Sequence, residues 1–147
     1  MASTHYYAQH AHQLKADLAR AIPRETLKAL HRRTAARHFV GTARQFLLLA
    51  ACTWGLITVE TPWVWLPLAV VQGFTVFNFT VLLHEVVHST IFQRHRPRAD
   101  RLLGFLYAIP SGISPTQFTR WHLDHHAELG SDEHDPKRHH LSPKTNW

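Results

Sequence analysis

The chain has one cysteine and one methionine in 147 residues, and the middle of the chain contains no Lys or Arg. A single cysteine excludes an intrachain disulfide, so thiol usage does not indicate the compartment. No Lys or Arg lies between Arg44 and Arg94, and the sixteen basic residues are divided between the two flanks of that gap. A net charge of +6 would favour nucleic acid as a partner of a soluble protein. The gap instead predicts a membrane protein, with no nucleic-acid partner.

The gap contains two apolar stretches, each long enough to cross a bilayer as a helix. The first, at about 44–60, is slightly short, and Arg44 and Glu60 at its ends can extend their side chains toward the headgroups. The second, at about 62–83, is uncharged and more than about 30 Å long as a helix. Because only a tight turn separates them, we expect an antiparallel transmembrane hairpin. Three tryptophans near its closed end suit the interfacial belt: Trp54, Trp63 and Trp65.

The segments that flank this hairpin are polar or interrupted. Residues 1–43 have the basic, weakly amphipathic pattern of a cytoplasmic, interface-lying region, and residues 44–147 would form the membrane domain. The stretch 102–119 is uncharged, but Gly104, Pro110, Gly112 and Pro115 interrupt it. Such a density of Gly and Pro predicts a broken, interfacial or re-entrant segment rather than a third span. The predicted fold is therefore an all-α integral membrane protein with one hairpin plus amphipathic helices.

The positive-inside rule places both ends of the hairpin, with the N-terminus, on the cytoplasmic side. The sequence HEVVH at residues 84–88 follows the second span, and helical spacing puts His84 and His88 one turn apart on one face. The sequence WHLDHH at 121–126 pairs His122 with His125 and His126 in the same way. Two clusters can share a metal site only on one side of the membrane, which requires that 102–119 does not cross it.

The other nine histidines show no common spacing, and we expect them to be solvated or interfacial rather than ligands: His5, His10, His12, His31, His38, His95, His134, His139 and His140.

The two clusters, about 35 residues apart, resemble the first two histidine boxes of membrane fatty acid desaturases. The sequences RLLGF at 101–105 and DP at 135–136 also resemble that family. The resemblance implies two iron ions that are held by His84, His88, His122, His125 and His126. Asp124 or Glu85 would orient a ligand imidazole. A third box, expected after further transmembrane helices, does not occur before Trp147, so we expect residues 1–147 alone to be an inactive N-terminal portion.

The resemblance also implies the chemistry. A desaturase of this family uses dioxygen and two external electrons to remove two hydrogens from adjacent carbons of an acyl-chain lipid, and releases water. The electrons would come from a ferredoxin or a cytochrome b5 type donor. The enzyme would be a multi-pass protein of the bilayer with its histidine boxes in the cytoplasm.

Three alternatives remain open on sequence alone. A related di-iron hydroxylase or ketolase that acts on alkanes, sterols or carotenoids would share these boxes. A membrane zinc protease would use His84 and His88 as ligands and Glu85 as general base, which leaves the second cluster without a role. A non-catalytic membrane anchor would need neither cluster.

Overall fold

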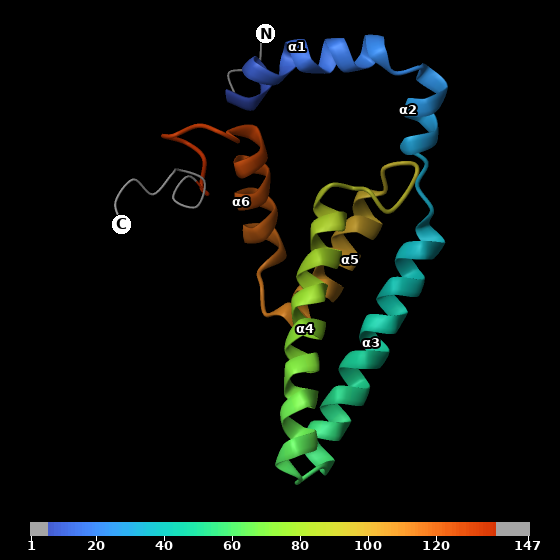
Figure 1. Ribbon diagram of the computed structural model, residues 1–147, viewed down its shortest axis with the longest axis vertical. Coiled ribbons are helices and arrows are strands. Elements are labelled where there is room, and N and C mark those ends of the chain that lie inside the picture. The colour runs from blue at the N-terminus through green and yellow to red at the C-terminus, as the bar shows by residue number, and fades with distance from the viewer. Residues whose placement is uncertain (1–5, 138–147) are drawn as a thin grey trace. The chain divides into compact units, whose positions relative to one another are not determined.

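The computed structural model describes residues 6–137, and these form helices joined by short connections, with no strand in that range (Figure 1). The chain divides into two compact units, which we describe separately. Residues 33–115 form the hairpin unit. Of the described residues, 6–32 and 116–137 belong to the terminal unit. The all-helical fold predicted from the sequence is confirmed within the described residues.

The hairpin unit is built on α3 (Ala35–Thr58) and α4 (Pro62–Val87), which contact each other along the antiparallel hairpin that the sequence predicts (Figure 1). Pro62 occupies the first turn of α4, where its missing N–H has no intrahelical acceptor to lose. Near the turn the helices approach closely at Gly55. A Cβ at this position would lie 2.8 Å from Leu68 Cδ1. Both helices extend beyond the predicted spans at the open end of the hairpin.

Two stretches are long and apolar enough to cross a membrane, Arg24–Thr58 and Pro62–Val87. Their large apolar side chains are mostly exposed, among them Trp54, Trp63 and Phe74 at 71%, 85% and 68%. In water such a surface would be strongly unfavourable, whereas in a bilayer it faces hydrocarbon. The hairpin is therefore suited to a lipid environment.

The third helix of this unit, α5 (Pro97–Ser111), packs on α4. Leu83 and Val86 of α4 lie next to Gly104, where a Cβ would make ordinary van der Waals contacts with them at 3.8 and 3.7 Å. Helix α5 tolerates Gly104 and Pro110 and ends at Gly112, whose φ of 65° is left-handed. The predicted interruption of 102–119 is thus confirmed, and it lies at residues 112–114. Helix α6 (Pro115–Ala127) begins after it.

The terminal unit contains α1 (Tyr6–Ala21), α2 (Arg24–Leu30), nearly all of α6 and the loop that follows α6. Helix α2 starts immediately after Pro23, whose φ of −56° suits the residue before a helix. The backbone N–H of Tyr6 donates to the Glu128 carboxylate at 3.4 Å, and the Tyr6 ring lies over Gly130. These contacts tie the start of α1 to the loop after α6.

Candidate metal centre

The first histidine pair lies at the end of α4. The helix continues through Val87, and the N–H of His88 donates to the His84 carbonyl at 3.2 Å, so the two residues lie one turn apart as predicted. Their rings are arranged edge to face, with centroids 4.7 Å apart and an interplanar angle of 65°. Because the end of the helix is regular up to His88, both imidazoles project from one face.

A left-handed residue ends this helix immediately after His88. Ser89 has a φ of 49°, and the N–H groups of Ser89 and Thr90 donate back to the carbonyls of Val86 and Glu85. This is the Schellman arrangement, in which glycine is the usual left-handed residue. Ser89 holds the conformation with a hydrogen bond from its hydroxyl to Asp100 at 3.1 Å, and the Arg33 guanidinium donates to the Ser89 carbonyl. The turn after the first histidine pair is therefore held by Arg33, just before α3, and by α5.

A partly buried polar network lies beside the same histidine pair. His38 Nδ1 lies 2.6 Å from the Glu85 carboxylate, His38 Nε2 lies 2.7 Å from the Tyr107 hydroxyl, and Thr42 Oγ1 lies 3.0 Å from that hydroxyl. A carboxylate only accepts, so the His38 Nδ1–H donates to Glu85. A neutral ring then accepts from Tyr107, and Tyr107 accepts from Thr42. The network joins α3, α4 and α5.

This network corrects the prediction for His38. Sequence spacing predicts a solvated or interfacial His38, whereas its side chain is only 5% exposed and both ring nitrogens are bonded. Its partners are 47 and 69 residues away, and no local spacing in the sequence could have indicated them. Burial raises the pKa of Tyr107; the Thr42 hydrogen bond lowers it and the Glu85 charge raises it, with a net increase. The Tyr107 hydroxyl therefore stays protonated and can donate.

The second histidine pair lies on α6. His122 Nε2 and His126 Nε2 are 3.0 Å apart, and the His122 ring stacks on Phe118 at an interplanar angle of 8°. A contact this short requires one N–H donor and one lone pair, or one metal ion between two lone pairs. Two nitrogens that bind one metal at about 2.1 Å are roughly 3.0 Å apart when the two bonds form a right angle and roughly 3.4 Å apart in a tetrahedral site. The spacing of this pair therefore fits metal coordination.

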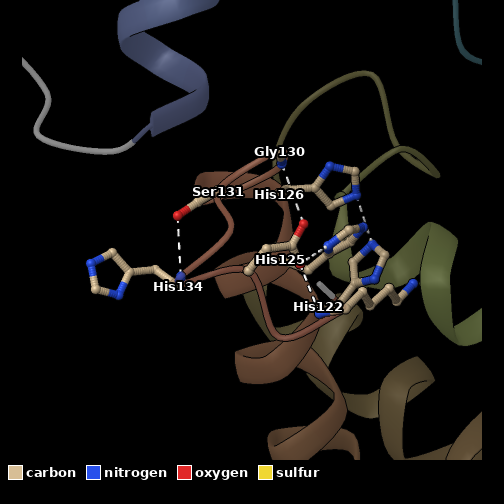
Figure 2. A network of polar contacts seen from close by, with 8 residues as sticks. His122, His125, His126, Gly130, Ser131 and His134 are labelled. Carbon is tan, nitrogen blue, oxygen red and sulfur yellow. Dashed lines mark hydrogen bonds and ion pairs between the residues drawn. The ribbon is translucent and has the colours of Figure 1, made fainter. Parts of the chain in front are cut away.

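His125, the remaining predicted ligand, points to a buried carboxylate. Its Nδ1 lies 2.7 Å from Asp135 Oδ1, and Asp135 is fully buried. Figure 2 shows His125 and its neighbours on α6 beside the loop that carries Gly130, Ser131 and His134. The backbone N–H groups of Gly130 and Lys137 also donate to Asp135, at 3.3 and 2.8 Å. Burial alone would raise the pKa of Asp135, but the hydrogen bonds from His125 and the two backbone N–H groups outweigh it and lower the pKa.

The carboxylates expected to orient ligands have other surroundings. Glu85 pairs with His38, which is not among the predicted ligands, and this contact engages the carboxylate that a protease mechanism would require as general base. Asp124 is exposed on α6. Sequence reasoning did not identify Asp135 as the partner of His125, although the DP sequence at 135–136 is itself a point of similarity to desaturases.

The other histidines in the described residues agree with the prediction of a surface position. His95 and His134 have side chains 65% and 70% exposed. His10, His12 and His31 are exposed on or next to α1 and α2. His5, His139 and His140 lie outside the described residues. Apart from His38, the assignment of these residues to the surface therefore holds for those that the structure describes.

Each unit thus presents histidines one helical turn apart, and the donor set is entirely imidazole, which suits iron, zinc or copper. Together with the two apolar helices, this defines a helical membrane protein whose histidine clusters are suited to bind a transition metal.

Comparison with known proteins gives the family. The fatty acid desaturase family model matches residues 60–147, more than half of the chain, and the protein belongs to that family. The sphingolipid delta(4)-desaturase DES1 of Drosophila melanogaster is 30% identical over 82 residues, 54% of this chain and 26% of that protein. The sphingolipid delta(4)-desaturase/C4-monooxygenase DES2 of Bos taurus is 28% identical over 107 residues, 72% of this chain and 33% of that protein. The chain thus spans about a quarter to a third of these relatives. No solved structure matches it.

Proposed function

We propose that this protein acts in the oxygen-dependent desaturation of a lipid chain, as a membrane oxidoreductase with a histidine-ligated di-iron centre. The observation that supports this most is the presence of two histidine clusters at helical spacing in a chain that belongs to the fatty acid desaturase family. The proposed ligands are His84, His88, His122, His125 and His126. Iron with dioxygen would supply the oxidant for an unactivated C–H bond, which acid-base side chains cannot attack.

The residues of the chain have three tasks in this proposal. The exposed apolar faces of α3 and α4 would hold the lipid chain next to the end of α4. The histidine pair on α4 and the cluster on α6 would bind the metal from one side of the membrane. The basic residues that flank the hairpin would keep that side cytoplasmic, within reach of a ferredoxin or cytochrome b5 type electron donor.

The substrate of this protein is either a fatty acyl chain or a sphingoid chain. The family description names fatty acids, whereas the relatives above are named for sphingolipids. The second outcome to consider is hydroxylation, because the Bos taurus relative is named as both a desaturase and a C4-monooxygenase. Both outcomes begin with removal of one hydrogen; they differ in whether a second hydrogen leaves or oxygen is added.

The test is expression of the complete gene in a host without such an activity, followed by mass analysis of fatty acids and sphingolipids. Desaturation removes two hydrogens from a lipid, and hydroxylation adds one oxygen. Purified protein should contain iron, and H84A and H122A should lose both the iron and the product. The matched control is H12A, an exposed histidine of α1, which should keep both. Unchanged iron content in H84A and H122A would contradict the proposal.

A further inference from the structure

Asp135 is the most deeply buried charged residue among those described, with its side chain 1% exposed. A buried carboxylate without partners costs several kcal/mol, and Asp135 avoids this cost with three hydrogen bonds. Two come from the backbone N–H groups of Gly130 and Lys137, so the loop after α6 is folded around the carboxylate. The third comes from His125 and is short, at 2.7 Å. Only this third contact reaches a predicted metal ligand.

The contact determines which nitrogen of His125 can bind a metal. Because ionised Asp135 only accepts hydrogen bonds, His125 Nδ1 must carry the ring proton in order to donate to it. In the neutral ring Nε2 then has the free lone pair. The His125 side chain is 11% exposed, and its ring stacks on that of Trp121 at an interplanar angle of 24°. Both the tautomer and the orientation of the ring are therefore constrained.

We infer that Asp135 is a positioning residue that holds His125 as its Nδ1–H tautomer and so makes Nε2 the nitrogen that can bind a metal. The part of this inference that concerns the metal rests on the proposed function. The part that concerns the tautomer does not, because it follows from the contact alone. Carboxylates that accept the second N–H of a ligand histidine fix its ring and raise its basicity, and their loss typically lowers metal affinity about 10- to 100-fold.

The tautomer is measured by ¹⁵N NMR of histidine side chains in the 147-residue protein, metal-free and in lipid nanodiscs. We expect His125 as the Nδ1–H form in the wild type. D135L removes the acceptor and should give a mixture of tautomers, whereas D135N keeps an acceptor oxygen and should restore the Nδ1–H form. The Nε2–H form of His125 in the wild type would overturn the inference.

Two control variants separate positioning from loop folding. S131A removes the acceptor of the His134 N–H in the same loop, and D132N neutralises an exposed carboxylate of that loop. Both should leave the His125 tautomer unchanged. A change of tautomer in S131A equal to that in D135L would reduce Asp135 to a structural residue of the loop and refute positioning.

Iron(II) binding to the protein expressed from the complete gene, with the same substitutions, tests the metal part. D135L should bind iron about 10- to 100-fold more weakly than the wild type, D135N should recover part of the loss, and both controls should bind like the wild type. Equal affinity in D135L and the wild type would refute the positioning role. If the complete wild-type protein bound no iron, the proposed function would be contradicted, and the Nδ1–H form of His125 would still support the contact with Asp135.

Discussion

The polar contacts beside the two histidine clusters differ in how far apart their partners lie in the sequence. Beside the pair on α4, His38 contacts residues 47 and 69 positions away, and three helices must pack before these contacts exist. Beside the cluster on α6, Asp135 is ten residues from His125 and is enclosed by its own loop. The first network depends on the fold of the whole hairpin unit, whereas the second is local.

This difference predicts how each network fails. Damage to the long-range network should destabilise the helix packing around α4, and damage to the local one should open a loop and leave the hairpin intact. The distinction would fail if a substitution in the long-range network opened only a loop, or if one in the local network destabilised the helix packing. The following experiments test it, from the largest expected effect to the smallest.

Tyr107→Ala should destabilise the hairpin unit most. Tyr107 is fully buried and connects α5 to α3, so truncation leaves a cavity and removes the partner of His38 and Thr42. Large aromatic-to-alanine changes in a core cost about 3–5 kcal/mol. Unfolding in mixed micelles, followed by circular dichroism, measures the loss. The matched control is Phe105→Ala on the same helix, 53% exposed, which should cost far less. Equal losses would mean that Tyr107 is not part of a core.

Sequence alone predicts the hairpin, the break between α5 and α6 and the helical spacing of the histidines, because each depends on local composition and period. It cannot predict the role of His38, because a histidine between Arg37 and Phe39, both exposed, looks like any surface residue until α4 and α5 pack against it. Asp135 is intermediate: its position near the second cluster is visible in the sequence, but burial of its side chain depends on how the loop turns at Gly130.

Asp135→Ala should have a smaller and local effect. It leaves His125 Nδ1 and the N–H groups of Gly130 and Lys137 without their acceptor, and an unsatisfied buried group costs about 1–3 kcal/mol. Hydrogen exchange at Gly130 and Lys137 should accelerate, while exchange in α3 and α4 stays at the wild-type rate. If protection of α3 and α4 fell as well, this network would not be local.

The long-range network can be measured directly with a double-mutant cycle on two hydroxyl groups. Tyr107→Phe and Thr42→Val each remove one hydroxyl of a 3.0 Å contact and retain nearly the same shape. The two changes should be non-additive by about 1.5 kcal/mol in the free energy of unfolding, as residues in direct contact are. Tyr107→Phe combined with Thr53→Val, which contacts Gln72 instead, should be additive within about 0.5 kcal/mol. Additivity in the first pair would show that the contact contributes nothing.

The smallest effect tests the end of α5, at the left-handed residue Gly112. Its φ is 65°, and among the described residues nothing lies within 4 Å of the place that a Cβ would take, so Gly112→Ala should cost about 1 kcal/mol through backbone conformation alone. Gly41 also has open space around it but lies inside α3, so Gly41→Ala should stabilise by roughly 0.5–1 kcal/mol. Opposite signs from the same added methyl group, measured by unfolding in mixed micelles, are the expected result. A stabilising Gly112→Ala would show that the chain does not require a left-handed residue there, and that α5 can continue toward α6 without the break.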